Sequence, residues 1–233
     1  MSPRRLRVSL VDWNQYDAAL FDPDGVLTPT AEVHMRAWGQ MFTDFLADHP
    51  DAAPYRDQDY FQYVDGKPRY EGVQSFLDSR QIELPFGDPS DAPAAETVCG
   101  LGNRKNDFFE HVLDTDGVEP YPGSVQLVLA LAERGTKMAI VSSSRNAPKV
   151  LAAAGMDHHF PIVVDGQVAA AEGLPGKPRP DTFLDAAAKL GVTKERSVVF
   201  EDAVSGVQAG RDGQFGLVIG VDRGAGADVL LSH

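Results

Sequence analysis

Four short apolar runs, each ended abruptly by polar residues, stand out in the pattern of hydrophobic and polar positions along the chain. Runs of this length that stop at turn-forming residues are typical of strands buried on both faces. We therefore predict core strands at residues 18–21, 138–141, 162–164 and 198–200, followed respectively by Asp22, Ser142, Asp165 and Glu201.

Helical patterns separate the later strands. They cover residues 124–134, 147–154, 182–190 and 205–210, and several end at a glycine in a C-cap position: Gly135, Gly155 and Gly191. Alternation of strands and helices from residue 121 onward favours a parallel sheet with helices on both faces. In such a sheet a ligand binds beyond the carboxyl ends of the strands, so the polar residues that follow the strands are candidates for one site.

The segment between residues 31 and 118 lacks this alternation and is predicted to form helices broken by loops, notably at 51–54 and 85–93. Tyr121, Pro122 and Gly123 mark the return to the alternating pattern. We therefore predict an α/β fold with a Rossmann-like parallel sheet core, formed by residues 1–30 and 119–233, and an inserted helical cap domain, formed by residues 31–118.

The composition is that of an ordinary globular protein, with 43% hydrophobic and 24% charged residues in a chain of 233. A net charge of −13 disfavours nucleic acid as a partner, because duplex binding requires clustered Lys and Arg side chains. An anionic substrate would then need local cations or a bound metal ion to offset the overall charge.

Two features bear on the location of the protein. Cys99 is the only cysteine, so no intramolecular disulfide can form, and the apolar stretch from Val8 to Val11 is too short for a secretory signal. No apolar run reaches the roughly 20 residues needed to cross a bilayer. We therefore expect a cytoplasmic protein with no membrane partner.

Asp22 and Asp24 flank Pro23 at the end of the first predicted strand. Residues two apart in an extended chain point the same way, so both carboxylates can face one site. Two carboxylates held close together favour a cation between them, and Mg²⁺ prefers oxygen ligands. The alternative is an ordinary solvated turn, for which the order Asp-Pro-Asp-Gly is equally suited.

Three other polar groups occupy comparable positions. Glu201 and Asp202 could supply oxygen ligands to a metal, or could cap the helix that follows. Lys177 could neutralise carboxylates and bind a phosphoryl oxygen, or could lie in solvent. The serines at 142–144 could form a phosphate cradle or a simple cap. Because each group stands at a strand end or before a helix, their joint occurrence favours a shared site.

Four segments of the chain resemble the four motifs of the haloacid dehalogenase-like superfamily, namely residues 21–28, 141–146, 176–181 and 200–206. The resemblance implies that Asp22 attacks phosphorus to form an aspartyl phosphate and that Asp24 is the general acid and base. It further implies that the transferring phosphoryl group contacts Ser142, the Ser143 amide and Lys177.

The same resemblance implies a Mg²⁺ cofactor. The ion would be held by the side chain of Asp22, the main-chain carbonyl of Asp24 and the side chain of Asp202, with Glu201 reaching it through water.

The inserted segment is similar to the cap of β-phosphoglucomutases at residues 31–38, 66–69 and 104–107, and the loop 144–146 shares this likeness. The likeness implies that a small-molecule sugar phosphate is contacted by residues of these segments: Gly66, Lys67, Arg69, Lys105, Ser144, Arg145 and Asn146. His34 and Trp38 lie four apart on one helix face and could close over the sugar, or His34 could pack on Trp38 at the domain junction.

The expectation that follows is magnesium-dependent interconversion of β-glucose 1-phosphate and glucose 6-phosphate. A phosphatase of small phosphorylated metabolites is an alternative, because the same motifs serve both reactions. A catalytically weak sugar-phosphate sensor is another, since Pro23 stands where the family usually has a residue with an amide hydrogen. The loop at 85–93 and the surroundings of Cys99 have no counterpart in the resemblance.

Overall fold

The sheet of the computed structural model, which describes residues 11–232, has five strands in the order β3-β2-β1-β4-β5. They are β1 Ala18–Phe21, β2 Lys137–Val141, β3 Ile162–Val164, β4 Ser197–Glu201 and β5 Leu217–Gly220. In the centre of the sheet, Leu20 of β1 pairs with Ala139 of β2 and with Val199 of β4. All pairings are parallel, so the carboxyl ends of the strands meet at one edge.

Helices cover both faces of the sheet, and the alternation of side chains along each strand separates two apolar clusters. On one face, Phe21 packs with residues of α5 Pro122–Glu133 and α6 Ala147–Ala153. On the other face, Leu20 packs with residues of α8 Asp181–Leu190 and α9 Val204–Asp212. The predicted Rossmann-like α/β architecture is confirmed.

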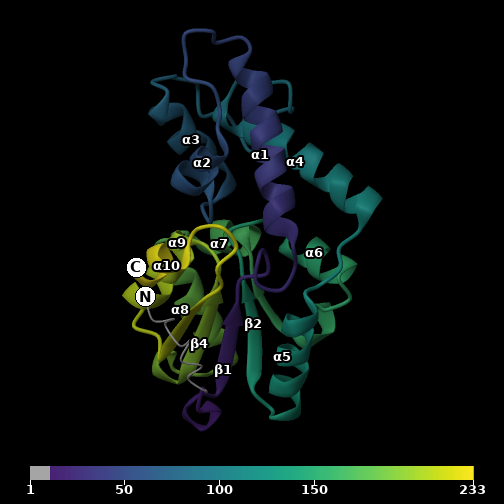
Figure 1. The fold of residues 1–233 in the computed structure, drawn as a ribbon, viewed down its shortest axis with the longest axis vertical. Helices are drawn as coiled ribbons and strands as arrows, with labels where there is room; N and C mark the ends of the chain where they lie inside the picture. The colour runs from purple at the N-terminus through teal and green to yellow at the C-terminus, as the bar shows by residue number, and fades with distance from the viewer. Residues whose placement is uncertain (1–10, 233) are drawn as a thin grey trace, which may run out of the picture.

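A layer of helices stands above the carboxyl ends of the strands (Figure 1). This helical layer consists of α1 Thr30–Leu46, α2 Asp57–Asp59, the π-helix η2 Tyr60–Val64, α3 Arg69–Ser79 and α4 Val98–Asp116. The helical layer has its own apolar cluster, in which Phe42 of α1, Phe76 of α3 and Leu101 of α4 are fully buried. The layer comes from the segment expected to be a helical insertion, and the domain limits themselves stay a prediction.

The two connections between the helical layer and the sheet lie side by side. The Tyr121 amide donates a hydrogen bond to the Leu27 carbonyl at 2.9 Å, and Ser124 Oγ donates to the Val26 carbonyl at 2.6 Å. The chain therefore leaves the core and returns to it at adjacent points, directly beyond the end of β1.

Three elements were not predicted from the sequence: β5, α7 Gly166–Glu172 and α10 Ala227–Ser232. β5 lies at the sheet edge and its residues are only partly buried or exposed, so its apolar run is less distinctive. Short 3₁₀ turns complete the chain at η1 Trp13–Gln15, η3 Asp157–His159 and η4 Lys194–Arg196. The C-cap glycines have the positive φ angles expected of them, +74° at Gly135, +67° at Gly155 and +65° at Gly191.

Hydrogen bonds fasten the loop at 85–93 to the helical layer. The Val98 amide donates to the Pro85 carbonyl at 3.0 Å, and Asn103 Nδ2 donates to the Pro89 carbonyl at 3.1 Å. The loop therefore packs against the start of α4.

No helix among the described residues combines the length and the apolar content that a membrane crossing requires.

Candidate active site

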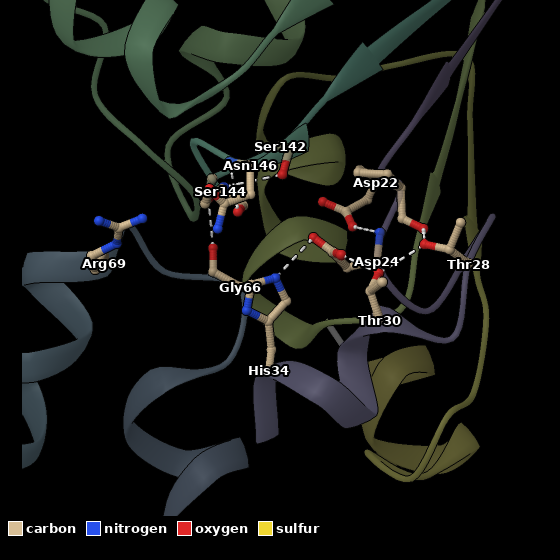
Figure 2. Close-up of polar contacts among 12 residues, drawn as sticks. Asp22, Asp24, Thr28, Thr30, His34, Gly66, Arg69, Ser142, Ser144 and Asn146 are labelled. Carbon is tan, nitrogen blue, oxygen red and sulfur yellow. Dashed lines mark hydrogen bonds and ion pairs between the residues drawn. The ribbon is translucent and has the colours of Figure 1, made fainter. Parts of the chain in front are cut away.

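A cavity of about 70 Å³ lies where the carboxyl ends of β1, β2 and β4 face the helical layer. Residues that follow these strands form one wall, which we call the floor, and residues of the helical layer form the opposite wall, the roof, which lies below the floor in the view of Figure 2. The floor contains Asp22, Asp24, Ser142, Ser143, Ser144, Asn146, Glu201 and Asp202. The roof contains His34, Trp38, Gly66, Lys67, Arg69 and Lys105.

Asp22 follows β1 directly and exposes only 6% of its surface. Its Oδ1 accepts a hydrogen bond from Lys177 Nζ at 2.6 Å, and its Oδ2 accepts one from the Asp24 amide at 2.9 Å. Burial raises the pKa of the Asp22 carboxyl well above its usual value, against the opposing charge of Lys177. Two donors on different parts of the chain therefore fix the orientation of this carboxylate.

Lys177 lies beneath the cavity, with 1% of its surface exposed. Its Nζ also donates to Glu201 Oε1 at 2.5 Å and to the Val141 carbonyl at 3.1 Å. Burial opposes the charged form, but the Asp22 and Glu201 carboxylates outweigh it and raise the pKa of Lys177. Glu201 Oε2 in turn accepts a hydrogen bond from the Ala203 amide at 2.9 Å. Both oxygens of Glu201 are thus engaged within the protein.

Asp24 points from the floor toward the helical layer (Figure 2). Its Oδ1 accepts a hydrogen bond from Thr30 Oγ1, and its Oδ2 lies 3.6 Å from Nε2 of His34. Burial acts to raise the pKa of Asp24, but His34 and Thr30 outweigh it, so that the pKa is lowered. On the other side of the imidazole, Nδ1 of His34 lies 2.5 Å from Nζ of Lys105. A continuous polar chain therefore joins Asp24 to a lysine of the roof.

Aromatic rings surround His34 and Lys105. His34 stacks on Phe109, with ring centroids 4.0 Å apart. Lys105 Nζ lies 5.0 Å from the ring centroids of Trp38 and of Phe109. Burial lowers the pKa of Lys105 well below its usual value, and the nearby charge of Arg69 adds to this. The ring that packs against His34 is therefore Phe109, which the sequence pattern did not identify.

The side-chain amide of Asn106 bridges the roof and the floor. Its Oδ1 accepts hydrogen bonds from Arg69 Nη2 at 2.6 Å and from Asn146 Nδ2 at 2.7 Å. Arg69 begins α3 and Asn106 lies in α4, whereas Asn146 precedes α6 of the core. Asn103 and Asn106 both accept hydrogen bonds from Arg69 with neutral amide oxygens, so its charge suits an anionic ligand.

The loop after β2 is folded by its own serines and touches the helical layer. The Ser144 amide donates to Ser142 Oγ at 3.0 Å, and Ser143 Oγ donates to the Gly66 carbonyl at 2.8 Å. Gly66 has φ +69°, and a Cβ atom there would lie 2.1 Å from Ser205 Oγ. Glycine is therefore required where the loop of the helical layer meets the core.

Asp202 lies against the turn that carries the first two aspartates, because a Cβ atom on Gly25 would come within 1.8 Å of its Oδ2. Burial raises the pKa of Asp202 well above its usual value, and the charges of Glu201 and Asp22 raise it further. The N-cap residue of α9 is Ala203, so Asp202 does not serve as a helix cap.

No three Asp, Glu, His or Cys side chains within residues 11–232 form a metal-binding cluster by themselves. A metal at this floor would therefore need main-chain oxygen atoms or water in addition to carboxylates. The accumulation of negative charge around Asp22 and Asp202 fits a hard cation with such mixed oxygen ligands, which is the coordination that Mg²⁺ takes.

Three residues that the sequence assigned to the site lie at its margins. Lys177 is directly below the cavity. The Nζ of Lys67 donates to Ser75 Oγ at 2.8 Å, at the rim. Arg145 departs from the expectation, because it lines a neighbouring cavity, where its guanidinium lies 5.4 Å from the centroid of the Tyr70 ring.

Sequence reasoning missed four polar residues of the site: Thr30, Tyr60, Asp65 and Asn106. Asn106 belongs to a segment that the resemblance had marked, and Asp65 directly precedes another. For Asn106 and Asp65 this position was the only signal in the sequence, because the roles of all four side chains depend on contacts across the cavity.

The family model for haloacid dehalogenase-like hydrolases matches residues 16–213. A β-phosphoglucomutase of Mycobacterium bovis is 49% identical over 212 residues, which cover 88% of this chain and 81% of that protein. A fructose-1-phosphate phosphatase of Escherichia coli is 30% identical over 85% of this chain and 93% of its own length. The crystal structure of a β-phosphoglucomutase from Clostridium difficile has the same fold, with a TM-score of 0.70, 23% identity, and coverage of 88% of this chain and 84% of that one.

Proposed function

Since the chain belongs to the haloacid dehalogenase-like hydrolases and is therefore a phosphotransferase or a phosphatase, we propose that it interconverts β-glucose 1-phosphate and glucose 6-phosphate. The observation that carries the proposal is one cavity with an acidic floor, Asp22 and Asp24, and a cationic roof, Arg69 and Lys105. Hydrolysis of a simple phosphate ester needs only the floor. A sugar bisphosphate also carries a second phosphate for the roof to bind.

In the proposed reaction a carboxylate oxygen of Asp22 attacks the C1 phosphorus of glucose 1,6-bisphosphate, and glucose 6-phosphate is the leaving group. The bond from phosphorus to the sugar oxygen breaks as the bond to Asp22 forms, and Asp24 donates its proton to the departing oxygen. In the other half-reaction a sugar hydroxyl attacks the phosphorylated Asp22 while Asp24 accepts the hydroxyl proton. Glucose 1,6-bisphosphate is the intermediate that links the two halves.

Lys177 would neutralise the carboxylate that becomes phosphorylated and the charge that develops on the phosphoryl oxygens. Its contacts with Asp22 and Glu201 already fix its position, so little reorganisation is needed during the reaction. Ser142 and the Ser143 amide would bind the same phosphoryl group from the opposite side.

Mg²⁺ is proposed to bind to the side chains of Asp22 and Asp202 and to the main-chain carbonyl of Asp24. Bound there, the ion would supply positive charge that stabilises the transferring phosphoryl group. Glu201 would assist only through water, because its two oxygens already contact Lys177 and the Ala203 amide.

The roof would hold the end of the substrate that does not react. Arg69, Lys105 and Asn146 would bind the second phosphate, and His34 and Trp38 would cover the sugar ring. Gly66, Lys67 and Ser144 border the same space. Arg145 would reach this phosphate only from the neighbouring cavity.

The decisive experiment is incubation with Mg²⁺, β-glucose 1-phosphate and a trace of glucose 1,6-bisphosphate, with glucose 6-phosphate and free phosphate both measured. The proposal expects glucose 6-phosphate without release of phosphate. Stoichiometric phosphate would instead make the protein a phosphatase, as the similarity to the Escherichia coli enzyme allows. Binding without either product would make it a sugar-phosphate sensor. The Asp22→Asn variant serves as the catalytically blank control.

A further inference from the structure

One acidic side chain of the cavity, Asp65, takes no part in the reaction proposed above. It follows η2 and borders the cavity beside Tyr60. The Asp65 amide donates to the Tyr60 carbonyl at 2.9 Å, and the Asp65 carbonyl accepts a hydrogen bond from Ser205 Oγ at 3.3 Å. Ser143 Oγ binds the next carbonyl, that of Gly66, at 2.8 Å. Helix α9 and the loop after β2 therefore hold the main chain of Asp65 and Gly66 in place.

The charges around Asp65 limit what its carboxylate can bind. Burial raises the pKa of Asp65 to about 7, a hydrogen bond from Tyr60 opposes this shift, and the charge of Glu201 adds to it. Asp65 in turn acts electrostatically on Asp202. A phosphate or carboxylate group of a ligand would be repelled at this position. The ligand groups that suit it are hydrogen-bond donors.

A purely structural role accounts poorly for this residue. If it only accepted the Tyr60 hydroxyl, a single oxygen would suffice, whereas a carboxylate offers about four acceptor positions. Asp65 lines both the catalytic cavity and the neighbouring one lined by Tyr121, so a ligand in this space lies next to it.

We propose that Asp65 accepts a hydrogen bond from a hydroxyl group of the sugar ring, and that it thereby selects hydroxylated phosphate esters over esters without hydroxyls. The inference rests on the proposed function for the placement of the substrate. With one phosphate on the floor and the other against Arg69 and Lys105, the ring has to lie in the space that Asp65 borders. A substrate that lacks the hydroxyl leaves a desolvated carboxylate unpaired, which is how such sites reject analogues.

The test compares kcat/KM for the sugar phosphate, for its monodeoxy analogues and for acetyl phosphate. Asp65→Ala should lower the ratio of sugar phosphate to acetyl phosphate turnover by about ten- to hundredfold, as expected for a hydrogen bond to a charged group. Asp65→Asn keeps one neutral acceptor and should lose less. The matched control Asp57→Ala removes an exposed carboxylate at the start of α2, outside the cavity, so its ratio should change by less than about threefold.

The analogues identify the hydroxyl. With the parent enzyme, kcat/KM for one monodeoxy sugar phosphate should be lower than kcat/KM for the sugar phosphate by the same factor. With Asp65→Ala, kcat/KM for these two substrates should be equal, because removing the hydroxyl and removing the carboxylate abolish the same contact. If every monodeoxy analogue loses the same factor in kcat/KM with Asp65→Ala as with the parent enzyme, no hydroxyl contacts Asp65 and the inference is wrong. An equal loss on sugar phosphate and acetyl phosphate also overturns it, since Asp65 would then act in the chemistry or in folding.

Product analysis keeps this inference separate from the proposed function. If free phosphate replaces glucose 6-phosphate as the product, the mutase proposal fails, and the selectivity ratio still decides the role of Asp65. If the parent turns over acetyl phosphate as efficiently as every sugar phosphate, both proposals fail. Melting temperatures of the Ala and Asn variants distinguish loss of folded protein from loss of selectivity.

Discussion

The basic side chains of the floor and of the roof have different partners. In the floor, Lys177 is ion-paired with carboxylates and is nearly completely buried. In the roof, Arg69 contacts the neutral amide of Asn106, and Lys105 contacts the imidazole of His34. The charge of Lys177 is therefore balanced inside the protein, whereas the roof is suited to receive an anion from outside. Changes in the floor should affect every phosphate ester, and changes in the roof only those with a second anionic group.

Replacement of the proposed nucleophile is expected to have the largest effect. Asp22→Asn keeps the shape and the contact with Lys177 but cannot form a phosphoenzyme, so turnover of sugar phosphate and of acetyl phosphate should both fall by about 10⁴-fold or more. Steady-state rates and acid-quenched labelling of the protein measure this. A variant that retains turnover within about tenfold of the parent would show that Asp22 is not the nucleophile.

Asp24→Asn tests whether proton transfer belongs to the floor. The side-chain amide can still accept the hydrogen bond from Thr30 but cannot act as acid or base, so turnover should fall by about 10²- to 10⁴-fold. Acetyl phosphate has a good leaving group, so labelling of Asp22 by it should be slowed less than labelling by a sugar phosphate. Equal slowing of both reactions would argue for a structural role of Asp24.

Arg69→Ala sharpens the contrast between floor and roof. Loss of its guanidinium should lower kcat/KM for the sugar phosphate by about 10²-fold, because remote binding energy orients the reacting end. Acetyl phosphate, which has no second anion, should lose much less. Lys149→Ala is a matched control, since Lys149 also joins the helical layer to the core but through exposed ion pairs with Glu110 and Asp114. Equal losses on both substrates would remove the main support for the mutase.

Pro23→Leu is expected to have the smallest effect and to act within the floor alone. Pro23 lacks an amide hydrogen between the two aspartates, and its carbonyl accepts hydrogen bonds from the Leu27 and Thr28 amides at 2.9 and 3.0 Å. Leucine keeps that carbonyl and adds a donor, so phosphorylation of Asp22 should accelerate by about tenfold with little change in sugar-phosphate affinity. Single-turnover rates measure the step. A parent enzyme that is already as fast would show that another group replaces the missing donor.

The core of the protein and most of the residues that form the floor could be predicted from the sequence. Its central strands are buried on both faces, so each appears as an uninterrupted apolar run, and Asp22, Ser142 and Glu201 follow these runs directly. Because parallel strands end at one edge, their order along the chain was enough to bring these residues together. The short, partly buried β5 escaped detection because its position at the sheet edge leaves a weaker pattern.

The contacts across the cavity, in contrast, depend on how the helical layer packs over the core. Asn106 lies far along the chain from both Arg69 and Asn146, and it joins them only because the helical layer stands over the core. Asp65 was missed for the same reason, and the structure places Arg145 at the neighbouring cavity, which shares Arg69, Ser142 and Ser143 with the first. Burial of a strand or of a helix face leaves a pattern of apolar residues in the sequence, because residues close together in the chain are buried together. A contact between two separately folded surfaces depends on how these surfaces meet, and no local sequence pattern contains that information.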